Sequence, residues 1–163
     1  MDLGYNYRIT DIQCALGLSQ FRKLHNFCKR RREVVNMYNE VFDGIESIQI
    51  PFESEDCNSN FHLYVLLFDF KKIGRERAQL MTELRRCDIQ TQVHYIPVYT
   101  QPFYREKFGT NWGDCPNAEG YYQKCLSIPL YPAMSDSDVE RVIDEIINIV
   151  KPVKKGRHSL LTG

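Results

Sequence analysis

The sequence lacks the features of a membrane-spanning, nucleic-acid-binding or metal-binding protein. No apolar run in its 163 residues approaches the ~20 residues that span a bilayer, and no secretory signal opens it. The 21 basic and 21 acidic side chains cancel, so no global charge recruits nucleic acid or an anionic membrane. The six cysteines form no C-x-x-C pair and have none of the close spacings of zinc ligands. We therefore expect a cytoplasmic protein with free thiols, no metal site, and neither nucleic acid nor membrane as a partner.

What is present suffices for a folded domain, since 43% of the residues are apolar and 12% are aromatic. A long segment with helical periodicity follows Thr10, which forms an S/T-x-x-E/Q capping box with Gln13. The segment predicts one long helix, or two helices with a bend within residues 19–24. Gly44 is a natural end for it, because glycine adopts the left-handed conformation that closes helices.

The rest of the chain alternates between strand and helix patterns. Residues 61–70 are almost continuously apolar, which predicts a central strand covered on both faces. Residues 75–86 predict a short helix, and the alternation over residues 89–96 predicts a second strand with one polar face. A last helix follows the Ser-Asp cap at residues 135–138.

Shorter elements complete the pattern: an ordered loop with helical turns (97–112), a helix (117–125) and a short extended piece (127–132). Together they predict an α/β fold, an α+β sandwich with a long N-terminal helix and a small, mostly antiparallel sheet. We expect three parts: a loop and long helix (1–45), a small α/β domain (46–152) and a disordered tail (153–163).

Three polar groups invite a functional interpretation from the residues alone. Asn6 and Arg8 precede a helix N-terminus, where a phosphate could bind, although turn asparagines and solvated arginines are also common. His94 shares a polar strand face with two glutamines, and a lone histidine is usually a satisfied polar group. The four basic residues 29–32 could be a nucleic-acid patch, but on a helix they would point in all directions, which favours solvated side chains. Residues 11–20 superficially suggest a helix-turn-helix, but no second helix with clustered basic residues follows them at the right distance.

Several segments, in order, resemble the pyridoxal-phosphate-dependent sugar aminotransferases of the DegT/DnrJ/EryC1/StrS family. They are Gly4-Tyr5-Asn6-Tyr7-Arg8, Thr10-Asp11-Ile12-Gln13, Gln92-Val93-His94-Tyr95-Ile96-Pro97-Val98, Cys115-Pro116-Asn117-Ala118-Glu119 and Leu126-Ser127-Ile128-Pro129-Leu130-Tyr131-Pro132. The resemblance covers about residues 3–152 and implies the small C-terminal domain of a fold-type I aminotransferase. Within the family it is strongest to UDP-4-amino-4,6-dideoxy-N-acetyl-beta-L-altrosamine transaminases.

The resemblance implies site residues. Asn6 would reach the phosphate of the cofactor in the partner subunit of a homo-oligomer, and Arg8 would contact or brace the same site. The nucleotide-sugar pocket would include His94, Tyr95, Tyr99 and Tyr131, with Tyr99 standing where close relatives often have a second histidine. His62, inside the most apolar stretch, is expected to be a buried structural histidine.

The implied reaction moves an amino group from glutamate through the pyridoxal phosphate cofactor to a UDP-linked 4-keto-6-deoxy sugar, for surface polysaccharide or nonulosonic acid synthesis. None of the nine lysines lies in a context like the lysine segment that anchors the cofactor in this family. We therefore expect a C-terminal part that lacks its anchor and is inactive alone. The alternative is a free-standing module that acts in dimerisation or binding without catalysis.

Overall fold

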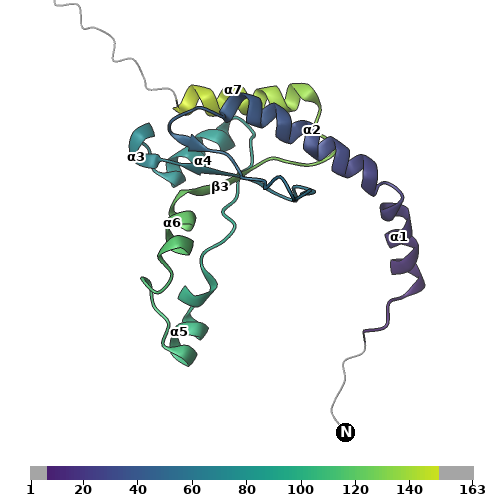
Figure 1. Cartoon of the computed structure of the whole chain (residues 1–163), viewed down its shortest axis with the longest axis horizontal. Coiled ribbons are helices and arrows are strands. Elements are labelled where there is room, and N and C mark those ends of the chain that lie inside the picture. The colour runs from purple at the N-terminus through teal and green to yellow at the C-terminus, as the bar shows by residue number, and fades with distance from the viewer. Residues whose placement is uncertain (1–6, 151–163) are drawn as a thin grey trace, which may run out of the picture.

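The computed structural model describes residues 7–150 (Figure 1). Asn6 and the expected tail at 153–163 lie outside the described residues. The elements, in chain order, are α1 (Asp11–Phe21), α2 (Leu24–Phe42), β1 (Ile48–Gln49), β2 (Tyr64–Phe68), α3 (Phe70–Ile73), α4 (Arg77–Arg86), the 3-10 helix η1 (Val98–Thr100), α5 (Pro102–Phe108), α6 (Pro116–Lys124), β3 (Cys125–Ile128) and α7 (Asp136–Val150). None of the helices within residues 7–150 is long and apolar enough to cross a bilayer.

The N-terminal helical segment consists of two helices, α1 and α2, which is the second of the two alternatives that the sequence left open. The capping box closes both ways: the Gln13 backbone N–H donates to Thr10 Oγ1 at 3.3 Å, and the Thr10 N–H donates to Gln13 Oε1 at 2.9 Å. Past α2 the chain turns through Gly44, whose φ of +83° lies in the left-handed region that glycine adopts without strain.

The sheet has three antiparallel strands in the order β1-β2-β3. Tyr64, Leu66 and Phe68 of β2 are buried, and the two residues between them are half-buried, so β2 is the central strand that the apolar run predicts. Tyr64 pairs with Ile128 of β3 and Phe68 with Ile48 of β1. The strand is shorter than the run, because residues 61–63 form a turn into it and α3 begins at Phe70.

The predicted strand over residues 89–96 is wrong. Only Gln92 pairs with β3, through its N–H to the Ser127 carbonyl (3.1 Å) and its carbonyl from the Ser127 N–H (2.8 Å). After this bridge the chain turns out toward η1, since Pro97 has no N–H with which to continue a ladder. The loop with helical turns predicted for 97–112 is confirmed as η1 and α5.

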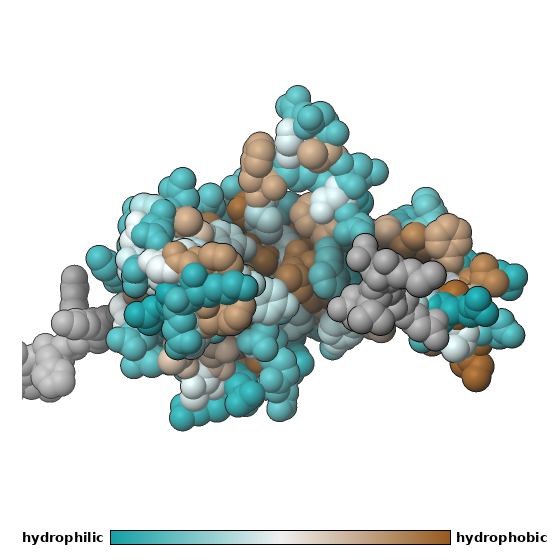
Figure 2. Space-filling view, turned by 90° about the horizontal axis from the view of Figure 1, so that it is seen from below, coloured by the Kyte–Doolittle hydropathy of each residue, from teal (hydrophilic) through white to brown (hydrophobic). Residues whose placement is uncertain are grey.

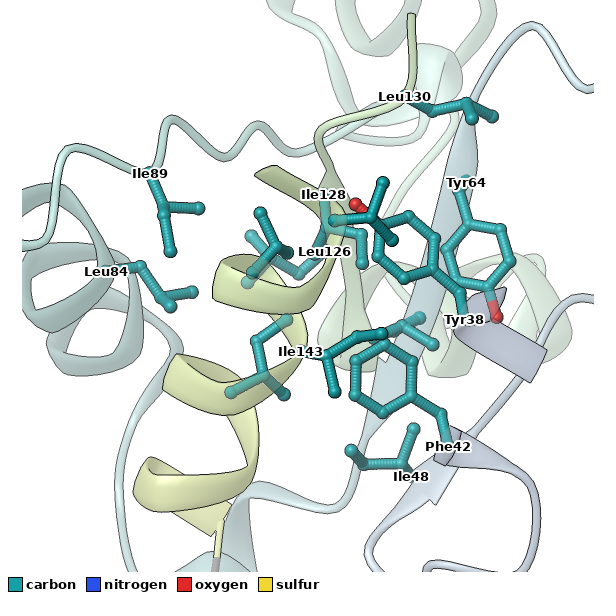
Figure 3. Close-up of a cluster of buried hydrophobic side chains, with 14 of the residues drawn as sticks. Tyr38, Phe42, Ile48, Tyr64, Leu84, Ile89, Leu126, Ile128, Leu130 and Ile143 are labelled. Atoms are coloured by element: carbon teal, nitrogen blue, oxygen red, sulfur yellow. The ribbon is translucent and has the colours of Figure 1, made fainter. Parts of the chain in front are cut away.

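The core lies where α2 and α7 run side by side against the sheet (Figures 1 and 3). Figure 3 shows Tyr38 and Phe42 of α2 packed with Tyr64, while Leu126 and Ile143 face them from β3 and α7. Burying a large apolar side chain stabilises a fold by roughly 1.5–3 kcal/mol. These contacts hold α2, β2, β3 and α7 together as one body.

Three consecutive arginines of α2 anchor loops, so the expected solvated face at 29–32 is wrong for them. Arg30 donates to the Met134 carbonyl and to Asp136 Oδ1, both at 2.7 Å. Arg31 donates to the carbonyls of residues 61, 62 and 130. Arg32 pairs with Glu53 at 2.7 Å. Successive helical residues point about 100° apart, so each arginine reaches a different segment.

His62 is exposed, and the expected buried histidine is wrong. Phe61, with a φ of +44°, turns the chain just before β2, so the pleat that buries Tyr64 does not extend back to position 62. Arg31 binds the carbonyls of both turn residues. The side chain of His62 instead lines a shallow groove beside α2 with Arg31 and Asn60.

Candidate functional site

His94 follows the bridge between Gln92 and β3, and its imidazole ring contacts a side chain of β3. Its Nδ1 is 2.8 Å from the hydroxyl of Ser127. Ser127 is buried, with 5% of its surface exposed, and it is a lone polar residue in a wholly buried strand. A buried hydroxyl needs a hydrogen-bond partner, and His94 supplies it.

Tyr95 packs against His94 and faces outward. The two rings meet edge to face, with centroids 4.6 Å apart and an interplanar angle of 86°, and the peptide bond between them is cis. Tyr95 is 71% exposed. The structure therefore brings these two predicted site residues together and presents an aromatic and an imidazole ring at the surface.

Tyr99 is engaged within the chain. Its hydroxyl donates to the carboxylate of Glu119 on α6, which also accepts the N–H of Gly113 at 2.6 Å. Burial, followed by the hydrogen bond to Glu119, raises the pKa of Tyr99 to about 12. This buried carboxylate, only 6% exposed, ties η1 to α6 and fixes the loop between them. Tyr99 is placed as a structural anchor of the segment that follows His94.

Tyr131 lines a different surface groove of about 310 Å³, bounded by residues 88–90, the exit of β3 and the start of α7. Its neighbours there are Asp88, Ile89, Gln90, Pro129, Met134, Asp138, Arg141 and Val142. The exit of β3 is fixed by Tyr38, whose hydroxyl donates to the Pro129 carbonyl at 2.8 Å. His94, Tyr95 and Tyr99 are not in the lining of this groove, so this groove holds only one of the four predicted pocket residues.

Arg8 is exposed and precedes α1, whose N-terminus carries a partial positive charge. These two features fit an anion such as a phosphate, while Asn6 lies outside the described residues. The six lysines within residues 7–150 are all exposed (Lys23, Lys29, Lys71, Lys72, Lys107 and Lys124). A lysine that holds a cofactor covalently is normally desolvated. Arg8 and the N-terminus of α1 therefore suit a phosphate, and each of the six described lysines is exposed in this chain.

Other ligand sites do not emerge in the described part of the chain. No group of three or more His, Cys, Asp and Glu side chains there could hold a metal ion. All six cysteines are free thiols, as the sequence predicts.

The surface of α1 is strongly apolar. Ile12, Leu16, Leu18 and Phe21 are each 60–83% exposed, and none of the residues of this helix is buried. Figure 2 shows brown side chains among teal ones at the right of the view, where Figure 1 places α1 past the body of the fold. Ile12 and Leu16 lie on one side of the helix and Leu18 and Phe21 on the other, and so many exposed large apolar side chains are typical of a contact surface.

Ser127 and Glu119 were missed in the prediction from sequence. Both are polar residues in apolar surroundings, and each supports a predicted site residue: Ser127 holds His94, and Glu119 holds Tyr99. A single serine within the apolar run at 125–130 is a signal that could have indicated Ser127. Glu119 has no such signal, because an acidic residue in a short helix is ordinarily solvated.

Comparison with known proteins gives a family match over most of the chain. The model of the DegT/DnrJ/EryC1/StrS aminotransferase family matches residues 1–147. The spore coat polysaccharide biosynthesis protein SpsC of Bacillus subtilis is 44% identical over 149 residues, which are 91% of this chain and 38% of that protein. A UDP-4-amino-4,6-dideoxy-N-acetyl-beta-L-altrosamine transaminase of Campylobacter jejuni is 34% identical over 156 residues, 96% of this chain and 41% of that enzyme.

Solved structures of aminotransferases superimpose on this chain. PseC of Helicobacter pylori, an aminotransferase involved in the biosynthesis of pseudoaminic acid, superimposes with a TM-score of 0.82 at 26% identity, over 92% of this chain and 40% of that one. The PLP form of Spr1654 from Streptococcus pneumoniae, a putative sugar aminotransferase by its description, gives 0.79 at 25% identity, over 88% of this chain and 36% of that one. The fold predicted from the sequence, a small α/β domain of a PLP aminotransferase, is confirmed. The chain spans about two fifths of the length of these relatives.

Proposed function

The chain belongs to the DegT/DnrJ/EryC1/StrS aminotransferase family, and we propose that it supplies the small-domain part of a pyridoxal-phosphate-dependent nucleotide-sugar aminotransferase. The observation that carries this proposal is the continuous family match over residues 1–147 in a chain that spans about two fifths of its relatives. Those relatives contain a further part that the residues of this chain do not cover.

The proposed reaction is amino transfer from glutamate to the ketone of a UDP-linked 4-keto-6-deoxy sugar. The product would serve a surface polysaccharide or a nonulosonic acid. The names of the relatives support this class, since one acts in spore coat polysaccharide synthesis and another is a UDP-amino-sugar transaminase.

The roles of this chain are to bind and to orient. His94 and Tyr95 form a paired polar and aromatic surface that suits a sugar or nucleotide, because one ring donates or accepts hydrogen bonds and the other stacks. Tyr131 contributes a second aromatic surface at the exit of β3. Tyr99, through Glu119, keeps the segment after His94 in place.

Asn6 would reach the phosphate of the cofactor in the partner subunit of a homo-oligomer, and Arg8 would contact or brace the same site. The cofactor, when bound, supplies an electron sink for the amino transfer. None of the nine lysines lies in a context like the anchoring segment of the family, and the six within residues 7–150 are exposed, so the covalent anchor would lie in a part of the enzyme that these residues do not cover. We therefore propose that the chain alone does not catalyse the reaction.

The exposed apolar side chains of α1 support the proposal that another domain of the enzyme contacts this helix. Ile12, Leu16 and Phe21 are each at least 62% exposed and lie on two sides of α1, so together they expose apolar area on the order of several hundred Å². In the proposed enzyme the large, cofactor-anchoring domain covers this area.

The proposal is tested by titrating UDP into the 15N-labelled chain and following the amide spectrum. We expect shifts at the amides of residues 92–96 that saturate with UDP, and none with equimolar sodium sulfate as the ionic-strength control. A His94→Gln, Tyr95→Ala double variant should lose the shifts while the spectrum of the core stays unchanged. No shift at residues 92–96 at millimolar UDP would contradict the proposed nucleotide contact and would favour a free-standing binding or dimerisation module.

A further inference from the structure

We propose that the shallow groove lined by Arg31, Asn60 and His62, beside the N-terminal half of α2, is a carboxylate-binding site. Its occupant is an aspartate or glutamate side chain of the domain that contacts α1. The identity of this occupant rests on the proposed function, whereas the carboxylate chemistry of the groove does not.

Arg31 differs from its two arginine neighbours in the way its charge is balanced. Arg30 pairs with Asp136 at 2.7 Å, and Arg32 pairs with Glu53 at 2.7 Å. Arg31 is half-buried, and within residues 7–150 it makes no ion pair. Carbonyl groups solvate a guanidinium without neutralising it, so a partly buried guanidinium gains from an anion beside it.

The guanidinium of Arg31 keeps one edge for a ligand. Its Nη1 donates to all three carbonyls, those of residues 61, 62 and 130, at 3.0–3.3 Å. In the part of the chain that the structure describes, its Nε and Nη2 make no hydrogen bond. Nε and Nη2 form a planar fork whose two N–H groups match the two oxygens of a carboxylate.

The groove has the size and lining for a carboxylate on a short apolar stem. Its volume is about 190 Å³. The lining combines polar with apolar side chains: Leu24, Phe27, Cys28, Arg31, Asn60, His62 and Pro132. The amide of Asn60 and the imidazole of His62 can donate further hydrogen bonds, and the apolar side chains suit methylene groups.

The lining also favours a protein side chain over a free amino acid. None of the described residues that line the groove is acidic, so the ammonium group of a free amino acid would find no anion there. An aspartate or glutamate within a polypeptide has no such group to satisfy.

The groove lies next to the exposed surface of α1. Leu24 begins α2 and is 47% exposed, three residues after Phe21, which ends α1 and is 72% exposed. Residues 22–32 contain six basic side chains and no acidic one. A domain that packs on the end of α1 therefore meets a cationic surface, which selects acidic groups on the partner.

The test uses glutamate blocked as its N-acetyl α-amide, which presents only the side-chain carboxylate. It is titrated into the 15N-labelled chain near pH 6.5, where the carboxylate is ionised, at constant ionic strength. We expect saturable shifts of the Arg31 Nε–H and of the amides of Asn60 and His62. Glutamine blocked in the same way is the control, and it should leave these signals unchanged because it has the same shape without the charge.

Two pairs of variants locate the site. Asn60→Ala and His62→Ala replace exposed side chains, and each should raise the half-saturating concentration about fivefold, as expected for one lost hydrogen bond. Asn26→Ala and His25→Ala are the matched controls, since these exposed residues of α2 lie outside the lining, and they should leave it unchanged. No saturable shift in the unsubstituted chain, or equal effects in the two pairs, would overturn the site.

Two further ligands test the occupant. Free L-glutamate and inorganic phosphate should each need a higher concentration for half-saturation than blocked glutamate does. Tighter binding of free glutamate would indicate a free amino acid, and tighter binding of phosphate would indicate a phosphate group. Either result would overturn the proposed occupant.

The UDP titration separates this inference from the proposed function, because it is read from the amides of residues 92–96. Saturable shifts with blocked glutamate support the carboxylate site even where UDP moves no signal. Shifts with UDP and none with blocked glutamate would leave the nucleotide contact supported and would overturn the carboxylate site.

Discussion

Replacing Tyr38 with phenylalanine tests how the core fixes the exit of β3. The Tyr38 ring is fully buried and packs on Tyr64, with centroids 4.9 Å apart, while its hydroxyl donates to the Pro129 carbonyl at 2.8 Å. Tyr38→Phe keeps the ring contacts and removes this single hydrogen bond. The carbonyl then loses its partner at the start of the segment that carries Tyr131.

The expected loss is about 1–1.5 kcal/mol in the free energy of unfolding, the lower half of the cost of an unsatisfied buried group, because Pro129 is half-buried and water can partly replace the phenol. With a urea dependence near 2 kcal/mol per molar, the midpoint should fall by roughly 0.5–0.8 M at an unchanged slope. Urea unfolding followed by circular dichroism measures both quantities.

The pH dependence adds a second readout. Burial raises the pKa of Tyr38 above the ordinary 10, so this phenol stabilises the fold fully below pH 10 and loses that contribution as the pH rises further. Above pH 10 the free energy of unfolding of Tyr38→Phe should therefore fall less with rising pH than that of the unsubstituted chain.

Tyr95→Phe is the control, because Tyr95 is 71% exposed and its variant keeps the ring that contacts His94. It should change stability by less than about 0.5 kcal/mol. A Tyr38→Phe variant as stable as Tyr95→Phe would refute the reasoning that the hydroxyl holds the exit of β3.

Three further predictions follow from single contacts. Arg31→Met should lower the free energy of unfolding by about 1–3 kcal/mol in urea titrations, since three carbonyls lose a charged donor; an unchanged midpoint would contradict this. The pKa of Tyr99 is raised to about 12, so its contribution to the free energy of unfolding is complete below pH 10 and is lost between pH 10 and 12. In Tyr99→Phe the free energy of unfolding should fall less with pH in that window. An unchanged pH dependence would argue against the bond to Glu119. Iodoacetamide at pH 8 should label exposed Cys57 well before Cys125, whose thiol is buried and has a raised pKa; peptide mapping that shows equal rates would contradict the burial.

Helical periodicity predicted the helices well because their burial repeats along one face. Val139, Val142, Ile143 and Ile146 of α7 keep the helical spacing in the sequence and are buried in the structure. The capping box at Thr10 likewise predicted the start of α1, since its two hydrogen bonds are local.

Features that depend on distant segments could not be predicted in this way. The alternation over residues 89–96 is typical of a strand, yet pairing needs a partner, and β3 pairs with Gln92 alone. The exposure of His62 and the anchoring by Arg31 depend on a turn at Phe61 that brings two carbonyls to α2. Sequence patterns report local burial and do not report which remote carbonyl an arginine reaches.

In the candidate site, too, local features were predictable and contacts between distant segments were not. The segment around His94 and Tyr95 could be selected from its residues, whereas the contact between His94 and Ser127 could not. Ser127 lies 33 positions away and meets His94 only because the bridge at Gln92 aligns the two segments. The roles of Asn6, Arg8, His94, Tyr95, Tyr99 and Tyr131 toward cofactor or substrate stay predictions.

We propose that this chain contributes binding surfaces to an aminotransferase and holds no covalent cofactor anchor. The most direct measurement is to mix the purified chain with pyridoxal phosphate, reduce with borohydride and locate lysine adducts by mass spectrometry. The account predicts low, scattered labelling over the exposed lysines and no stoichiometric adduct. Stoichiometric labelling of one lysine would contradict it, because the chain would then anchor the cofactor by itself.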